Sequence, residues 1–204
     1  MIDAPVLNVA ALTPGTRALG PGLRSVLWVQ GCPFRCPGCI AENWIPDRPA
    51  TTMTPAQAAR ALAVQPDLQG VTFSGGEPME QAAGLTEVIT SMRRDRDLDL
   101  ICFTGYRLER LRDRPPNPGV PGLLAAVDVL IDGLYRDDRN DGRGLRGSTN
   151  QRVHHLTDRL TGTDYDFTGR ARTIELQQAG DDLLMVGVPD PVLASAFRPA
   201  HRED

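Results

Sequence analysis

Lysine is absent from this chain of 204 residues, and all 22 of its basic residues are arginines. Catalysis by a lysine amine, for example through a Schiff base, is therefore excluded. The formal net charge is −4, so the chain lacks the basic field that attracts nucleic acid. Arginine favours planar, two-pronged contacts with carboxylates or phosphates, although a compositional bias of the source genome is the simpler explanation.

Long apolar runs are also absent. No stretch approaches the 18 residues that a membrane-spanning helix needs, and the N-terminus shows no signal-peptide pattern. Residues 1–190 are predicted to form one domain, followed by a flexible tail over residues 191–204. We expect a cytoplasmic protein that binds neither membranes nor nucleic acid.

Cysteine is scarce, yet three of the four cysteines fall close together, at Cys32, Cys36 and Cys39. Clusters that only transfer electrons are held by four cysteines, and structural zinc sites also close with four ligands. Three thiolates would leave one iron of a 4Fe–4S cluster open to a substrate. The fourth cysteine, Cys102, lies in an apolar run, where we expect it to pack in the core.

Two alternatives for the cysteines stay open at this point. In the first, Cys102 completes a four-ligand zinc or iron site. In the second, the cysteines form disulfides, which a chain long enough to bury an adequate core does not need. The clustered thiols favour a reducing compartment instead.

Apolar runs with strand character alternate with helical stretches, which is the pattern of βα units around a parallel sheet. Thr54 is predicted to cap a helix that has Pro55 at its first position and reaches about Val64. A second helix is predicted over residues 79–94. The predicted parallel strands are residues 24–30, 71–74, 98–103 and 127–132.

The C-terminal part carries weaker signals. Residues 172–177 and 183–188 are expected to pair as a small antiparallel edge, and proline and polar residues at 115–121 and 137–150 predict loops. The fold class is therefore α/β, and we predict a partial, open β/α barrel with a mostly parallel sheet.

Glycine-rich or polar turns follow the predicted strands. In open α/β sheets, ligands bind beyond the carboxyl ends of the strands, so we expect these turns to converge with the cysteine loop. A Gly75-Gly76 pair lets the backbone approach a ligand closely, and Glu77 can accept hydrogen bonds from an ammonium group. Alone, this sequence would be an ordinary turn; its place at the same edge favours ligand binding. The turns are Gly75-Gly76-Glu77-Pro78, Thr104-Gly105 and Asp132-Gly133.

These residues together carry a resemblance to a known family. Three cysteines with this spacing, followed by a strand-terminal Gly-Gly-Glu-Pro, resemble the radical S-adenosylmethionine superfamily. Within it, the chain resembles the anaerobic ribonucleoside-triphosphate reductase activating proteins and, more distantly, the pyruvate formate-lyase activating enzymes. The further motifs that carry this resemblance are Trp44, Thr104-Gly105-Tyr106, residues 128–133 and residues 146–152.

The resemblance implies that Cys32, Cys36 and Cys39 hold three irons of a 4Fe–4S cluster. It implies that S-adenosylmethionine chelates the fourth iron and is cleaved by an electron to methionine and a 5′-deoxyadenosyl radical, which abstracts hydrogen from the substrate. Gly75, Gly76 and Glu77 would face the methionyl ammonium, and the backbone around Gly38 and Ile40 would lie along the adenosine. The implied cofactor-binding residues are Gly38, Ile40, Ser74, Gly75, Gly76, Glu77, Pro78, Thr104, Asp132, Ser148, Asn150 and Gln151.

The chain also departs from the family pattern. A basic residue often follows the Asp-Gly of the fourth strand in relatives, and here Arg136 or Arg146 would have to substitute for it. Gly38, where many superfamily members carry an aromatic residue, agrees with the reductase activators. His154 and His155 are adjacent, so we expect them on opposite sides of a strand, as packing or surface residues.

Three functions follow as hypotheses. In the first, the chain is an activase that abstracts a hydrogen from a glycine of a large glycyl radical enzyme, with a flavodoxin- or ferredoxin-type reductant. In the second, it is a stand-alone radical maturase that acts on a peptide or small metabolite. In the third, the cluster only transfers electrons or senses redox state.

Overall fold

A computed structural model describes residues 5–179 and 182–196 of the chain. At its centre lie the four parallel strands that the sequence predicts, side by side in the order β2-β4-β5-β6. They are almost fully buried because helices and C-terminal segments cover both faces, which explains their continuous apolar runs. Their bounds are β2 Arg24–Val29, β4 Gly70–Gly75, β5 Asp99–Thr104 and β6 Val129–Asp132.

Antiparallel strands extend this parallel centre at both edges. β1 (Leu7–Thr16) pairs with β2, β3 (Thr51–Met53) pairs with β1, and β7 (Arg152–His155) pairs with β6. The sheet therefore has seven strands in the order β3-β1-β2-β4-β5-β6-β7. It is a mixed sheet, and the predicted closure toward a partial barrel stays a prediction.

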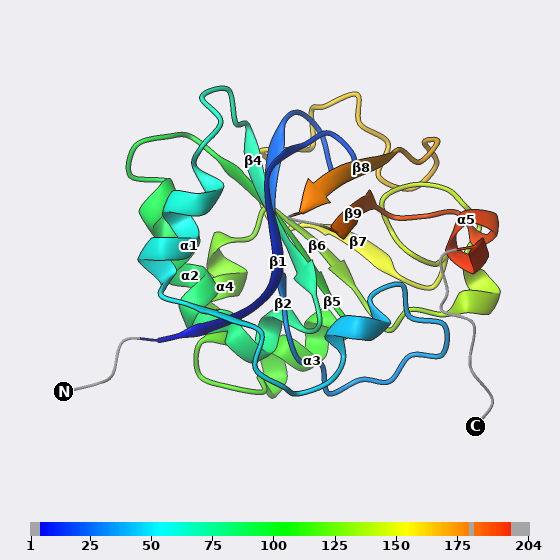
Figure 1. Cartoon of the computed structure of the whole chain (residues 1–204), viewed down its shortest axis with the longest axis horizontal. Helices are drawn as coiled ribbons and strands as arrows, with labels where there is room; N and C mark the ends of the chain where they lie inside the picture. The colour runs from blue at the N-terminus through cyan, green and yellow to red at the C-terminus, as the bar shows by residue number, and fades with distance from the viewer. Residues whose placement is uncertain (1–4, 180–181, 197–204) are drawn as a thin grey trace.

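One face of the sheet is covered by helices that connect the parallel strands (Figure 1). The first helix begins as predicted, because Thr54 accepts a hydrogen bond from the Gln57 backbone N–H while the Gln57 side chain accepts one from the Thr54 backbone N–H. The α-helices of this face are α1 Pro55–Leu62, α2 Ala82–Met92, α3 Leu108–Asp113 and α4 Val120–Ala126. Short 3₁₀ turns are η1 Glu42–Trp44, η2 Pro78–Gln81 and η3 Asp137–Arg139.

The other face is covered by C-terminal residues. β8 (Ile174–Ala179) and β9 (Asp182–Gly187) form a separate antiparallel pair, and α5 (Pro191–Ala196) follows. Figure 1 shows β8 and β9 on the opposite side of the large sheet from α1 and α2. Within the described residues, no helix is long and apolar enough to cross a membrane.

Successive side chains of each strand serve these two cores in turn. In β2, Leu27 packs with the helices, whereas Trp28 packs with the C-terminal segments. In β5, Ile101 lies in the C-terminal core and Cys102 lies among the helices. This alternation follows from the two-residue period of a strand. Cys102 is fully buried and free, so the prediction that it packs in the core is confirmed.

Several sequence-based boundaries were wrong. The predicted loop at 115–121 overlaps α4, and the helix predicted over 79–94 is a 3₁₀ turn followed by an α-helix that ends at Met92. Residues 191–196 of the predicted flexible tail form α5, where Asp190 accepts a hydrogen bond from the Leu193 backbone N–H. Residues 197–204 lie outside the described residues.

Candidate metal centre and cofactor site

The cysteine loop leaves the end of β2 and returns to it. Gly31 donates to the Trp44 carbonyl at 2.9 Å, and Cys32 donates to the Ile45 carbonyl at 3.0 Å. These two bonds close the segment between them into a loop whose base is fixed on the sheet. Cys32, Cys36 and Cys39 are partly exposed and free.

The three thiols lie near enough to influence one another. Burial raises the pKa of Cys32 to about 12, and the charges of Glu77, Cys39 and Cys36 add to the increase. Burial likewise raises the pKa of Cys36 and Cys39, partly offset by the backbone amides of Tyr135 and Ala41 respectively. Burial thus favours the protonated thiols, whereas metal coordination deprotonates a thiol outright.

This donor set fits a 4Fe–4S cluster better than a single metal ion. Among the described residues, no group of three or more His, Cys, Asp or Glu side chains is arranged around one ion. A cluster does not need such convergence, because each cysteine binds a different iron. Cys102 lies inside the core and is fully buried. Three cysteines therefore belong to the loop, and the fourth lies apart from them.

The Gly75-Gly76 turn packs directly against the base of the cysteine loop. Gly76 donates to the Val29 carbonyl at 2.7 Å, and Glu77 donates to the Gly31 carbonyl at 2.9 Å. A Cβ atom at Gly76 would lie 2.1 Å from the Gly31 oxygen, and Gly75 has a φ of +104°. The two glycines are therefore required by backbone contact between the two turns.

Glu77 is buried and joins two turns of the site. Its carboxylate accepts hydrogen bonds from Thr104 Oγ1 at 2.8 Å, from the Gly105 N–H at 2.7 Å and from the Met79 N–H at 3.0 Å. Burial nevertheless raises the pKa of Glu77 to about 7. Because these partners belong to the protein, Glu77 connects the end of β4 to the end of β5.

Asp132, at the end of β6, is fully buried among cations. Its carboxylate accepts hydrogen bonds from Arg152, from Arg107 and from the Leu108 N–H, and His154 Nε2 lies 3.1 Å away. Burial opposes ionisation, but the hydrogen bonds from Arg152 and Leu108 and the nearby positive charges lower the pKa of Asp132 to about 2. Asp132 is thus occupied by the chain's own donors.

The polar loop before β7 supports the backbone after β6. Gln151 donates to the Gly133 carbonyl, Asn150 donates to the Leu134 carbonyl, and the Ser148 hydroxyl accepts from the Arg136 N–H. The backbone amide of Tyr135, inside this supported segment, contacts the Cys36 thiol. Ser148, Asn150 and Gln151 therefore fix the segment that faces the cysteine loop.

The remaining predicted residues lie around the same edge. Gly38 has a φ of +69°, and Ile40 beside it is 37% exposed. Ser74 is partly buried near the end of β4, and Pro78 is buried at the start of η2. Ser74, Thr104 and Asp132 lie at the carboxyl ends of their parallel strands. Ser148, Asn150 and Gln151 lie in the loop before β7.

The basic and histidine candidates take other roles. Arg136 pairs with Asp138 on the surface, and Arg146 donates to the Thr149 carbonyl at 3.3 Å. His154 lies beside Asp132, whereas the ring of His155 packs edge-on against Phe167. The two histidines therefore lie on opposite sides of β7, as the sequence predicts.

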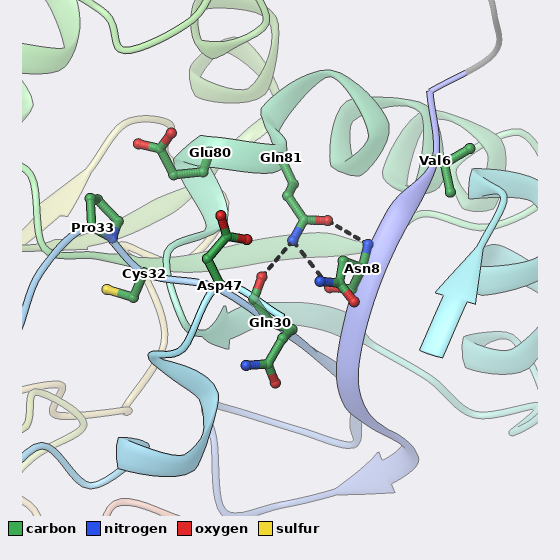
Figure 2. Close-up of a pocket in the computed structure, with 9 residues that line it drawn as sticks. Val6, Asn8, Gln30, Cys32, Pro33, Asp47, Glu80 and Gln81 are labelled. Atoms are coloured by element: carbon green, nitrogen blue, oxygen red, sulfur yellow. Dashed lines mark hydrogen bonds between the residues drawn. The ribbon is translucent and has the colours of Figure 1, made fainter. Parts of the chain in front are cut away.

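Two cavities flank the cysteine loop. One, of about 430 Å³, is lined by Cys32, Asp47 and Glu80, and Figure 2 shows Gln81 bonded to Asn8 and Gln30 at its wall. The other, of about 460 Å³, lies beyond the β5 and β6 turns. Its lining is mostly basic and apolar: Phe34, Gly105, Tyr106, Arg107, Arg110, Leu134, Arg136, Arg139 and Asn150.

Sequence reasoning missed several residues that organise this edge. Arg107 and Arg152 hold Asp132, and Gln81 ties β1 to the cysteine loop. Arg152 is the last residue of the motif at 146–152. Its role could not be predicted from that motif, because it depends on the pairing of β7 with β6. Gln81 carries no sequence signal, because its role depends on a partner 73 residues away.

Comparison with known proteins places this geometry among iron–sulfur proteins. Residues 18–154 match the model of the 4Fe-4S single cluster domain. The anaerobic ribonucleoside-triphosphate reductase-activating protein of Vibrio cholerae is 33% identical over 147 residues, which cover 68% of this chain and 91% of the relative. The protein of that name from Enterobacteria phage T4 is 30% identical over 159 residues, covering 74% and 96%. The pyruvate formate-lyase-activating enzyme of Staphylococcus epidermidis is 34% identical over 80 residues, covering 36% and 32%.

Proposed function

Because the chain belongs to the 4Fe-4S single cluster domain family, we propose that it places an unpaired electron on a glycine of a larger partner enzyme. As a member of this family it is an iron–sulfur enzyme, and its cofactors are a 4Fe–4S cluster and S-adenosylmethionine. The proposal rests on the loop with three free thiols, whose base contacts the Gly75-Gly76 turn. The fourth cysteine is buried elsewhere, in the core.

The residues divide the work as follows. Cys32, Cys36 and Cys39 hold three irons and leave the fourth open to the amino and carboxylate groups of S-adenosylmethionine. When bound, the cluster would pass one electron from a flavodoxin- or ferredoxin-type reductant to S-adenosylmethionine, which would thereby supply the chemistry that removes the glycine hydrogen, with methionine and 5′-deoxyadenosine as products.

The surrounding turns position the cofactor. The backbone of Gly75 and Gly76 would face the methionyl ammonium, and the exposed stretch around Gly38 and Ile40 would hold the adenosine. Glu77 acts through Thr104 and Gly105, because its carboxylate accepts hydrogen bonds from the Thr104 hydroxyl and the Gly105 N–H. Ser148, Asn150 and Gln151 act through the backbone after β6.

The partner is proposed to be a large glycyl radical enzyme of the anaerobic ribonucleotide reductase type. The relatives that are similar over most of their length are named for activating such a reductase. The described structure also leaves the cysteine loop at an open edge between two cavities, where a loop of another protein can approach the cluster.

The metal site is tested by alanine substitution of each cysteine. Loss of Cys32, Cys36 or Cys39 is expected to abolish cluster assembly after anaerobic reconstitution, measured as iron and sulfide content. Cys102→Ala serves as the matched control, because its thiol is buried in the core. Loss of iron from a folded Cys102→Ala protein would contradict the three-cysteine site.

The cofactor is tested by low-temperature EPR of the reduced cluster. Adding S-adenosylmethionine is expected to change the spectrum, because one iron is open to a new ligand. A cluster that only transfers electrons has four protein ligands and would show no change. An unchanged spectrum would therefore favour electron transfer or redox sensing over radical chemistry.

A further inference from the structure

Arg172 lies outside the segment 18–154 that matches the family model, yet it contacts the loop that supports the site. It precedes β8, next to Ala171, which bridges to Arg143. The Arg172 side chain is 4% exposed. Burying a guanidinium to this degree requires hydrogen bonds for its donors.

The guanidinium of Arg172 satisfies its donors with the loop from Asn140 to Gly147. Nη2 donates to the Arg146 carbonyl at 2.7 Å and also to two neighbouring carbonyls. Nη1 donates to Asn140 Oδ1 at 2.7 Å and to the Pro189 carbonyl at 2.8 Å. Nε donates to the Gly144 carbonyl at 3.2 Å.

The nearest carboxylate contributes little to holding this cation. Asp141 Oδ1 lies 3.8 Å from Nη2, beyond hydrogen-bond distance. Burial lowers the pKa of Arg172, but an arginine keeps its charge in proteins. Carbonyl oxygens of the loop and of Pro189 are therefore its main partners. This one side chain bonds to several points of the loop, beside the backbone hydrogen bonds that Gly144 and Leu145 donate to the Arg170 and Phe167 carbonyls.

The same loop continues into the residues that fix the site. The Gly147 and Ser148 N–H groups donate to Gln151 Oε1, and Gln151 in turn donates to the Gly133 carbonyl. Ser148 accepts from the Arg136 N–H. A continuous set of hydrogen bonds thus runs from Arg172 to the backbone beside Cys36.

We propose that Arg172 is a positioning residue through which the C-terminal segment holds residues 140–151, and with them the cofactor side of the cysteine loop. The effect on S-adenosylmethionine rests on the proposed function; the effect on the loop does not. The donors of Arg172 are taken by this loop and by the Pro189 carbonyl, so its removal acts through loop order.

Hydrogen exchange of the cluster-free protein tests the loop directly. Arg172→Ala is expected to speed exchange at least tenfold in peptides covering 133–136 and 143–151, while exchange in α1 and α2 stays unchanged. Arg170→Ala is the matched control, because it also removes an arginine side chain from this segment, but one that contacts Tyr165 instead of the loop. Equal exchange of these peptides in wild type and Arg172→Ala would overturn the proposal.

Cofactor affinity supplies the second measurement. The reconstituted Arg172→Ala protein is expected to keep its iron but to bind S-adenosylmethionine at least tenfold more weakly, and low millimolar guanidinium ion is expected to restore part of the loss. If Arg172→Ala does not fold, Arg172→Lys is used, since lysine keeps the charge but has three donors instead of five. Wild-type affinity in a folded variant would overturn the proposal, whereas absence of binding by the wild type would count against the proposed function alone.

Discussion

Glu77 is a motif residue whose carboxylate is buried and holds the neighbouring turns in place. The family resemblance places it near an ammonium group, and in the structure its buried carboxylate accepts hydrogen bonds from Thr104, Gly105 and Met79. A buried acceptor with these donors fixes the positions of Thr104 and Gly105 relative to the cysteine loop. The motif is therefore needed even though its acidic side chain faces inward.

Removing the Glu77 carboxylate should loosen this edge. Glu77→Ala leaves the Gly105 and Met79 N–H groups without an acceptor, at a cost of about 1.5–3 kcal/mol. Through the displaced turns we expect roughly ten- to hundredfold weaker S-adenosylmethionine binding by anaerobic titration, with iron content retained. Glu87→Ala, on the exposed side of α2, is the control, and unchanged affinity in Glu77→Ala would reject this role.

Asp132 makes a prediction about pH. Its pKa is 3.8 without interactions and about 2 in the folded chain, so its ionised form stabilises the fold above pH 4, and this stabilisation is lost as the pH falls toward 2. In urea unfolding of the cluster-free protein, the stability advantage of wild type over Asp132→Asn should shrink by about 1 kcal/mol between pH 6 and pH 3. A difference that does not vary with pH would contradict the buried ion pairs.

At the scale of elements, the contact between the cysteine loop and the Gly75-Gly76 turn decides whether the site assembles. Gly76→Ala would place a methyl group 2.1 Å from the Gly31 oxygen. Moving the two backbones apart would break the hydrogen bonds that Gly76 and Glu77 donate to the Val29 and Gly31 carbonyls. We expect the variant to take up less than half of the wild-type iron on reconstitution.

The control for this substitution is Gly162→Ala, where nothing lies within 4 Å of the added methyl group. It should reconstitute like wild type. Full iron uptake by Gly76→Ala would show that the two turns do not need to approach as closely as described.

The parallel strands could be predicted because they are buried on both faces and read as continuous apolar runs. β1 escaped prediction because Pro14 and Gly15 interrupt it and its register shifts between Thr13 and Thr16. β7 is polar in sequence, and it forms because Arg152 pairs across to Asp132. Long-range pairing of this kind leaves no local pattern to read.

The two helices that were not predicted do carry helix-start signals in the sequence, but neighbouring residues that favour loops outweighed these signals. α4 has Pro121 in its first turn, where proline is tolerated, but the nearby prolines and glycines favoured a loop. Asp190 before Pro191 is an N-cap followed by proline, the pattern of a helix start. The expectation of a flexible tail ignored that pattern, and α5 begins there.

At the scale of the whole molecule, the seven-stranded sheet of the described residues lies between two hydrophobic cores. The region that matches the family model ends at residue 154, and later residues cover the second face through side chains such as Phe167 and Val186. Glu175 fastens this cover to the end of β1 by accepting from Thr16 Oγ1 at 2.7 Å. The C-terminal residues therefore belong to the fold, and through Arg172 they reach the site.

The central claim is that this chain generates a radical on another protein. The decisive measurement is EPR after anaerobic incubation with a reductant, S-adenosylmethionine and the cognate large glycyl radical enzyme, with Cys32→Ala as the inactive control. We predict a doublet glycyl radical signal that forms together with 5′-deoxyadenosine and only when the partner is present. Rapid multiple turnover on a free small molecule, with no radical on any protein, would contradict the activase function and favour the maturase.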